Sequence, residues 1–295
     1  MSTIYSQPMT PMTPDYLTES LKVYWFAPPV ALWRAIELRV AAEEQYERPL
    51  LDLGCGDGLV GRALFGTTGY ADVGLDPWAS QVRQAARSGV YRHVDVADGY
   101  HLPYPDGAFA TVFSNSVLEH IPDVGRVVRE VGRVLRCARP VDGEPGGRFI
   151  FTVPSDSFRY FLDGYIQRMA AGHRRAAEAY AAAVDARLEH YHYQTPREWQ
   201  QLLGTAGMTM IKARYYIPKE VERLWDRLNV RYGIGQRRSA WGLLVSPRLR
   251  FMGYQALLRR LVVRTLSQRW RSTYETEVPL GKKGGGLLIV ARRED

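Results

Sequence analysis

The sequence predicts an α/β protein built on a doubly wound, mostly parallel sheet with helical insertions. From residue 49 onward, short apolar runs alternate with helical patterns, the order expected of parallel strands covered on both faces. A glycine-rich turn follows the first run, and acidic residues follow the first three. With 295 residues and 46% hydrophobic side chains, the chain is long and apolar enough to bury a sizeable core.

The first part of the chain is expected to lie outside this sheet. Residues 1–15 are rich in Met, Thr and Pro, which is typical of a mobile arm. Residues 16–46 have a helical pattern that breaks at Pro28-Pro29 and resumes with Trp33, Ile36 and Val40. Residues 1–47 are therefore predicted to form an arm and a helical cover.

The alternating region defines the predicted strands and helices. Strands are expected at residues 49–53, 71–75, 91–96, 109–114 and 148–153, and helices at 59–65, 78–88 and 123–137. Further along, a helical segment is expected at 158–189, a helix at 196–206, a strand at 208–217, more helix at 219–272 and a last strand at 287–292. The main domain is predicted to comprise 48–217 plus 284–295, with 218–283 as a helical insert.

The glycine turn is the first candidate binding element. Asp52 is followed by Gly54, Gly56 and Gly58, and glycines there allow a sharp turn and close approach of a ligand to the backbone. The same residues fit a dinucleotide fingerprint running from Gly56 to Gly61, and a purely structural turn is a third interpretation.

Three carboxylates at successive strand ends favour a positively charged ligand over a pyrophosphate. Asp52 could face a cationic amino group, and Asp76 could accept hydrogen bonds from ribose hydroxyls. Trp78 offers a flat face for adenine. The Asp98 carboxylate and the Gly99 backbone N–H could recognise the adenine amino group and its neighbouring ring nitrogen by hydrogen bonds. A pyrophosphate would instead require helix N–H groups without added negative charge.

Five motifs in order resemble the class I S-adenosylmethionine-dependent methyltransferases, and especially the broad subgroup that contains quinone-biosynthesis and natural-product methyltransferases. They are Leu51–Gly58, Gly74–Pro77, Asp98–Phe109, Ser114–Ile121, and Arg133–Arg136 followed by Pro145–Phe149. The resemblance covers residues 48 to 154 and resumes weakly at Tyr193–Met208. Two departures are Ala110, where the family usually has Asp, and the extra loop residues Cys137 to Glu144.

The resemblance implies a seven-stranded sheet whose last strand, 287–292, is antiparallel. It also implies S-adenosylmethionine as cofactor, with contacts expected at Asp52, Gly54, Gly56, Asp76, Pro77, Trp78, Asp98, Gly99 and Asn115. The implied activity is transfer of a methyl group to a small-molecule or lipid-like acceptor, with O-, N- and C-methylation all open.

Methyl transfer from a sulfonium is an in-line displacement that depends on positioning, and an oxygen or nitrogen acceptor also calls for a general base. His120 and His192 are the candidate catalytic bases, with structural roles as the alternative. The two cysteines and six histidines show no ligand spacing that indicates a metal site, so catalysis is expected to need no metal.

Positive charge is concentrated in the predicted insert. The net charge is +8, and residues 227–274 contain eleven arginines and no acidic residue. On a helix, Arg260, Arg264 and Arg271 share one side, opposite an apolar face of Phe251, Tyr254, Leu258, Leu261, Val262 and Leu266. Such a helix either packs on the core with a solvated basic face or contacts an anionic membrane through residues 241–271.

The sequence has no apolar run long enough for a membrane span and no secretory signal pattern. A cytoplasmic protein is expected, and the basic helix extends this expectation to peripheral contact with the inner face of the membrane. No nucleic-acid partner is expected. Two other functions stay open: a nicotinamide-dependent oxidoreductase using the same turn, and a catalytically silent protein that binds a partner through the insert. The three carboxylates argue against the silent protein.

Overall fold

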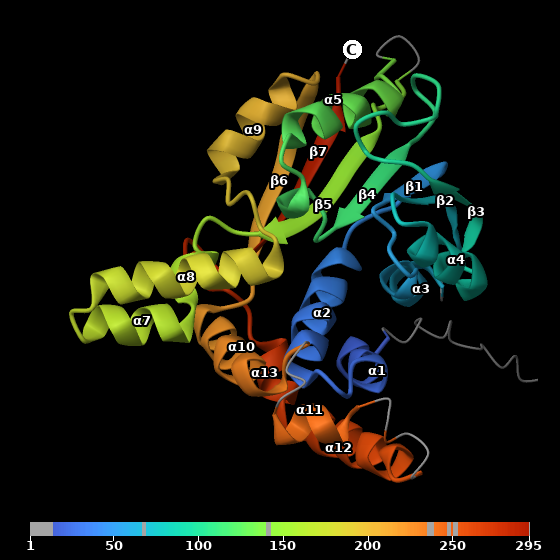
Figure 1. Ribbon diagram of the computed structural model, residues 1–295. Helices are drawn as coiled ribbons and strands as arrows, with labels where there is room; N and C mark the ends of the chain where they lie inside the picture. Colours follow the sequence, from blue (N-terminus) through green and yellow to red (C-terminus); the bar gives the residue numbers. More distant parts are fainter. Residues whose placement is uncertain are drawn as a thin grey trace, which may run out of the picture.

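A computed structural model describes residues 14–66, 69–139, 143–234, 239–246, 249 and 253–294. Its centre is a seven-stranded sheet in the order β3-β2-β1-β4-β5-β7-β6 (Figure 1). The strands are β1 Leu50–Leu53, β2 Ala71–Asp76, β3 Tyr91–Val96, β4 Thr111–Asn115, β5 Arg148–Pro154, β6 Met208–Tyr216 and β7 Gly286–Arg293. β1 to β5 run parallel, and β7 is antiparallel to both β5 and β6. The predicted doubly wound sheet is confirmed.

Successive residues of the central strands pack on opposite faces of the sheet, because side chains alternate along a strand. Ile150 belongs to the core on one face, whereas its neighbours Phe149 and Phe151 belong to the core on the other. The first face is covered by α1 Tyr16–Val23, α2 Pro28–Ala41 and α3 Leu59–Phe65, and the second by α5 Val124–Val134 and α9 Pro196–Gly204. Figure 1 shows α5 and α9 together on their side of the strands.

The chain between β5 and β6 departs from the prediction of one helical segment at 158–189. Residues 158–189 form three helices, α6 Phe158–Phe161, α7 Asp163–Ala170 and α8 Arg174–Leu188. The left-handed conformation of Gly172, with φ of 76°, separates α7 from α8 and lets them fold back on each other. A small third core joins Phe158, Tyr165 and Val184 to Trp225 of α10 Lys219–Tyr232, which follows β6.

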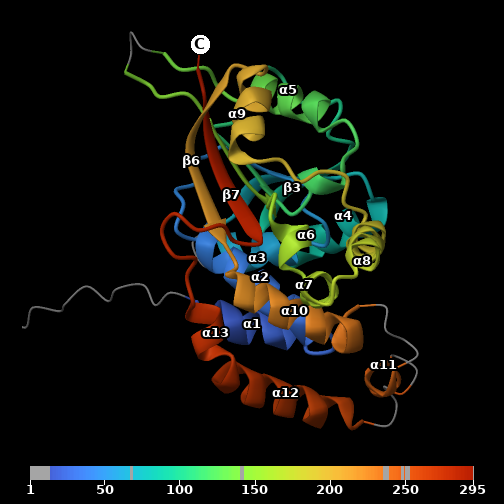
Figure 2. The ribbon, with the colours of Figure 1, turned by 90° about the vertical axis from the view of Figure 1, so that its left-hand side faces the viewer.

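The helical region between β6 and β7 is also divided. It contains α10 Lys219–Tyr232, α11 Ala240–Leu244, α12 Gln255–Arg269 and α13 Arg271–Glu275. α10 packs against α2, and α12 lies along α1 as an outer layer, far from the sheet (Figure 2). The division of the chain into a domain and an insert therefore stays a prediction, since these helices join the same cover as the N-terminal helices. Most of the expected N-terminal arm lies outside the described residues, as does Phe251.

The face of α12 that meets the protein differs from the predicted one. Val263, Leu266 and Trp270 pack against the core, whereas Leu261 keeps 60% of its surface exposed. Arg271 forms an ion pair with Asp15, so it is not part of a free basic face. The prediction was wrong at Leu261, because periodicity defines an apolar stripe but not which edge of it meets the neighbouring helix. Among the described helices, none has the length and apolar character needed to cross a membrane.

Leu266→Ala and Leu261→Ala form a matched pair that tests this packing. Because Leu266 contacts the core, its truncation should lower the free energy of unfolding by about 1–2 kcal/mol, less than for a fully buried leucine. Leu261→Ala makes the same change in helix propensity and should stay within about 0.5 kcal/mol of the parent. Urea denaturation measures both, and equal losses in the two variants would contradict the observed orientation of α12.

Candidate functional site

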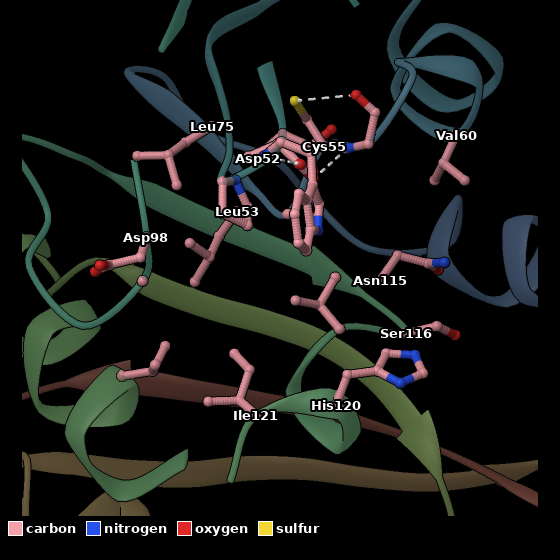
Figure 3. Close-up of a pocket in the computed structure, with 18 of the residues that line it drawn as sticks. Asp52, Leu53, Cys55, Val60, Leu75, Asp98, Asn115, Ser116, His120 and Ile121 are labelled. Atoms are coloured by element: carbon pink, nitrogen blue, oxygen red, sulfur yellow. Dashed lines mark hydrogen bonds between the residues drawn. The ribbon is translucent and has the colours of Figure 1, made fainter. Parts of the chain in front are cut away.

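A pocket of about 640 Å³ opens where the carboxyl ends of β1, β2, β3 and β4 meet. Parallel strands end at the same edge of a sheet, so residues that follow different strands come together there. Figure 3 shows side chains from all four connections around this space, among them Asp52, Leu75, Asp98 and Asn115. Its volume lies in the range of about 300–1,000 Å³ that is typical of small-molecule sites.

The glycine turn shapes one wall of the pocket. Gly54 has φ of 77° and donates its N–H to the carbonyl of Leu75 at 2.8 Å, which ties the turn to β2. A Cβ on Gly54 would lie 2.5 Å from a methyl group of Val117, so both the dihedral angle and the space require glycine. Gly58, with φ of 80°, is the N-cap of α3.

Asp76 ends β2 and is held by the backbone on both oxygens. Oδ2 accepts the Gly56 N–H at 3.0 Å, and Oδ1 accepts the Trp78 N–H at 2.9 Å. Each carboxylate oxygen can accept two hydrogen bonds, so the rigidly placed Asp76 can still receive hydroxyl groups from a ligand. Trp78 stands beside it with 69% of its surface exposed, free to offer a ring face.

Asp52 is buried at the back of the pocket. Its Oδ2 accepts a hydrogen bond of 2.6 Å from the Tyr91 hydroxyl. Burial, together with the negative charge of Asp76, raises the pKa of Asp52 to about 7, although the Tyr91 hydroxyl acts in the opposite direction. A positively charged ligand group would favour the ionised carboxylate, so this corner is suited to a cation.

Asp98 and Gly99 follow β3 at the rim. Asp98 Oδ1 accepts the N–H groups of Tyr100 and His101 at 2.9 and 3.1 Å, which fixes the loop, and the Asp98 side chain remains more than half exposed. The rim can therefore present both a carboxylate and a backbone N–H to a planar polar group.

A buried carboxylate that sequence analysis did not identify connects α2 to the pocket. Glu37 is 1% exposed, and its Oε1 accepts hydrogen bonds from Trp33, Ser116 and Tyr216 at 3.0, 2.6 and 3.0 Å. Its Oε2 accepts Arg34 at 2.7 Å and Asn115 at 3.3 Å. The one signal in the sequence is an acidic residue inside the otherwise apolar helix that begins at Pro28-Pro29.

Two further pocket residues were not predicted from the sequence, and one of them, Arg34, is held by Glu37. Tyr24 and Arg34, from the helical cover, line the pocket together with His120 and Glu189. They come from the N-terminal cover, the segment after β4 and the chain after α8, and Figure 3 shows His120 at the end of the pocket away from Asp98. Burial lowers the pKa of His120, so its imidazole is neutral at pH 7.

The residues expected to bind a cofactor all line this one pocket. They are Asp52, Gly54, Gly56, Asp76, Pro77, Trp78, Asp98, Gly99 and Asn115, and His120 lines it as well. His192 does not belong to the lining; its Nε2 lies 2.7 Å from the Ile121 carbonyl and 3.0 Å from that of Pro122.

The structure differs from the expectation that the histidines form no ligand set. Glu119, His120 and His190 each offer one ligand atom, and these atoms lie within 4.8 Å of one another. This cluster could not be predicted from residue spacing, because His190 is brought in by the chain after α8, 70 residues away from His120. Both cysteines are free, Cys55 being buried and Cys137 exposed.

Residues 51–151 match the family described as a methyltransferase domain. This stretch of the chain therefore carries a methyltransferase domain. Among its relatives, methyltransferase GfsG of Streptomyces halstedii is 36% identical over 119 residues, which cover 36% of this chain and 40% of that protein. The 27-O-demethylrifamycin SV methyltransferase of Amycolatopsis mediterranei is 34% identical over 105 residues, covering 34% and 36%. The matches thus span well under half the length of these two relatives.

The fold of the methyltransferase domain extends beyond the matched stretch. A crystal structure from Thermotoga maritima, described as a SAM-dependent methyltransferase and possible histamine N-methyltransferase, aligns with a TM-score of 0.54 at 13% identity. The alignment covers 94% of this chain and 99% of that one, which shows a shared fold. The expected class I architecture, including the antiparallel last strand, is confirmed.

Glu37→Ala tests the network that ties α2 to the pocket. Removal of the carboxylate leaves buried donors on Trp33, Asn115 and Tyr216 without their acceptor, and should lower the free energy of unfolding by about 3–5 kcal/mol. Glu37→Gln keeps the shape and one carbonyl acceptor, so it should cost clearly less. Urea denaturation compares the variants, and a loss below about 1 kcal/mol for Glu37→Ala would refute the role of the network.

Proposed function

We propose that this protein transfers a methyl group from S-adenosylmethionine to a small-molecule acceptor. The observation that carries the proposal is the convergence of Asp52, Asp76 and Asp98 on one pocket at the strand ends of a methyltransferase domain. Names of relatives such as the rifamycin and ubiquinone-biosynthesis O-methyltransferases support a small molecule as acceptor.

The polar groups around the pocket fit the three parts of this cofactor. Asp76, fixed by two backbone N–H groups, would accept the ribose hydroxyls. Trp78 and Pro77 would contact adenine, whose amino group would meet Asp98 and Gly99. Asp52, Gly54 and Gly56 would surround the amino-acid end, where a buried carboxylate matches an ammonium group.

When bound, the cofactor supplies a methyl group on a cationic sulfur. The chain's own contribution is to hold the acceptor in line with that methyl group at the end of the pocket formed by Tyr24, Arg34, His120 and Glu189. This end is lined by residues of the N-terminal cover and of the chain after α8. His120 is the candidate for activating the acceptor, because it faces the pocket and carries a neutral imidazole.

For His192, the geometry favours a positioning role over the catalytic one that its sequence suggests. Its ring is engaged with the carbonyls of Ile121 and Pro122, and this contact holds the chain that leads out of the segment bearing His120. Asn115 is likewise committed to Glu37 and Thr152, which favours a supporting role at the pocket wall.

The two other functions are less well supported. A nicotinamide dinucleotide would bring its pyrophosphate close to the carboxylates of Asp52 and Asp76, and like charges there disfavour binding. A catalytically silent partner-binding protein has no use for a pocket that keeps three carboxylates.

Asp76→Ala should weaken binding of S-adenosylhomocysteine by about 1.5–3 kcal/mol, or roughly 10- to 150-fold, because hydrogen bonds from the ribose to a charged group are lost. Isothermal titration calorimetry measures the affinity. Asp106→Ala is the matched control, since Asp106 is an exposed carboxylate outside the pocket and should leave the affinity unchanged.

Two results would count against the proposed function. One is an unchanged affinity in Asp76→Ala, which would remove Asp76 from the site. The other is saturable binding of NADH, seen by fluorescence, without binding of S-adenosylhomocysteine, which would favour the oxidoreductase.

We further propose that the acceptor is lipid-like and is collected at an anionic membrane surface through residues 241–271. α12 exposes Leu257 and Leu261, at 71% and 60%, next to the exposed Arg260 and Arg264. Leu243 and Leu244 of α11 are exposed as well. Apolar and basic side chains on one outer layer match the requirements of an interfacial helix.

Liposome co-sedimentation tests this surface. Arg260→Gln with Arg264→Gln should weaken binding to phosphatidylserine-containing vesicles by about 30-fold, at about 1 kcal/mol per arginine. Arg83→Gln with Arg87→Gln removes the same charge from exposed positions on α4 Ala79–Ser88 and should have little effect. The membrane proposal would be contradicted if the parent protein bound neutral and anionic vesicles equally, or if both double variants lost the same amount of binding. In that case α12 serves only to cover α1.

A further inference from the structure

Beside the acceptor end of the pocket, three potential metal ligands come together from two segments of the chain. Glu119 and His120 lie in the short 3-10 helix Leu118–His120 after β4, and His190 follows α8. The backbone N–H of Tyr191 donates to the Glu119 carbonyl at 2.8 Å, which fastens the two segments together next to the side chains. The rings of His120 and His190 lie 5.1 Å apart.

Each histidine has one nitrogen engaged by its surroundings, which leaves the other for a ligand. His120 Nδ1 lies 3.1 Å from the Glu189 carbonyl, an acceptor, so Nδ1 carries the proton and Nε2 holds the lone pair. Nε2 lies on the side of Glu119, 3.9 Å from its Oε1. A backbone carbonyl that binds the second imidazole nitrogen is the usual support of a metal-binding histidine.

The tautomer of His190 is set by a longer chain of hydrogen bonds. The Tyr193 hydroxyl donates to Asp185 Oδ1 at 2.6 Å, so its oxygen is left to accept from His190 Nδ1 at 3.0 Å. Nε2 of His190 therefore holds the lone pair too. Asp185 is anchored in turn by Arg159 at 3.0 Å, and the ring of His190 is confined by Phe158.

Glu119 is the unusual member of the group. Its side chain is 2% exposed, and its Oε2 has no hydrogen-bond partner among the residues that the structure describes. An unpartnered carboxylate oxygen in the interior is costly unless a cation or a donor satisfies it. Thus a buried, unsatisfied acid stands beside two histidines with available lone pairs.

We propose that Glu119, His120 and His190 bind one divalent first-row transition-metal cation, with Zn²⁺ as the expected occupant. Two imidazoles and one carboxylate suit Zn²⁺, Fe²⁺ or Co²⁺ better than Mg²⁺ or Ca²⁺, which prefer oxygen ligands. Three protein ligands leave coordination positions open, as in catalytic zinc sites. With metal–ligand distances of about 2.1 Å, the ligand atoms of a tetrahedral site lie about 3.4 Å from one another. The three ligand atoms here lie within 4.8 Å of one another, so side-chain rotations that move each atom by roughly 1 Å would complete the site.

The place of this site relative to the pocket gives the cation a role. His120 lines the pocket, so a cation on its Nε2 would border the acceptor end and would replace the free imidazole as the group that activates the acceptor. This consequence rests on the proposed methyl transfer, whereas metal binding itself does not. An acceptor hydroxyl that binds the cation would release its proton to solvent, and its oxygen would then attack the methyl carbon as the carbon–sulfur bond breaks. The acceptor class favoured by such a site is a phenol or another hydroxyl compound.

Titration with Co²⁺ under anaerobic conditions, on tag-free protein treated with a chelator, tests the site without an activity assay. The expected result is a visible absorption band that saturates at one Co²⁺ per chain and disappears on addition of one equivalent of Zn²⁺. His190→Ala and the isosteric Glu119→Gln should each weaken Co²⁺ binding by at least 100-fold. His93→Gln is the matched control, because His93 is an exposed histidine on β3 outside the cluster.

The outcomes separate this proposal from the proposed function. Absence of a saturable band, or equal Co²⁺ binding by the parent protein, Glu119→Gln and His190→Ala, overturns the metal site. Binding of S-adenosylhomocysteine, followed by calorimetry on the same samples, reports on the proposed function alone. Loss of Co²⁺ binding with retained S-adenosylhomocysteine binding in both variants supports the metal site, since it rules out general unfolding.

Discussion

The buried carboxylate of Glu37 is the interaction on which the acceptor end of the molecule depends. It lies on α2 and accepts hydrogen bonds from its own helix, from the end of β4 and from β6. A buried carboxylate is tolerated when all its hydrogen bonds are made, and these bonds form in one position of α2 against the sheet. That position brings Arg34 to the pocket and supports Ser116, whose φ of 51° is strained for a residue with a Cβ.

The opposite end of the pocket is governed by unbalanced negative charge. Asp52 and Asp76 are both buried, and the proximity of Asp76 contributes to the raised pKa of Asp52. This arrangement favours the neutral acid in the free protein, and a bound cation reverses that preference. The free protein therefore carries an electrostatic cost that a sulfonium and ammonium ligand would remove, which makes the site selective for positive charge.

The acceptor side combines segments that the methyltransferase domain proper does not supply. α1 and α2 precede the first strand, and the chain after α8 lies between β5 and β6. α12 then covers α1 from outside. The proposed cofactor side is thus built on the sheet, while the proposed acceptor side is built on additions to it.

Much of the fold and of the cofactor pocket could be predicted from the sequence because both depend on local signals. Strand and helix boundaries follow periodicity. Gly54, Asp76 and Asp98 are recognised because glycine turns and acidic strand ends are patterns of neighbouring residues in the sequence. The acceptor end could not be predicted in this way. Glu37 meets Ser116 and Tyr216, and Glu119 meets His190, through contacts between segments separated by up to 179 residues. The exposed edge of α12 was set by its fit against α1. Such contacts depend on packing of whole elements, which the tertiary structure alone decides.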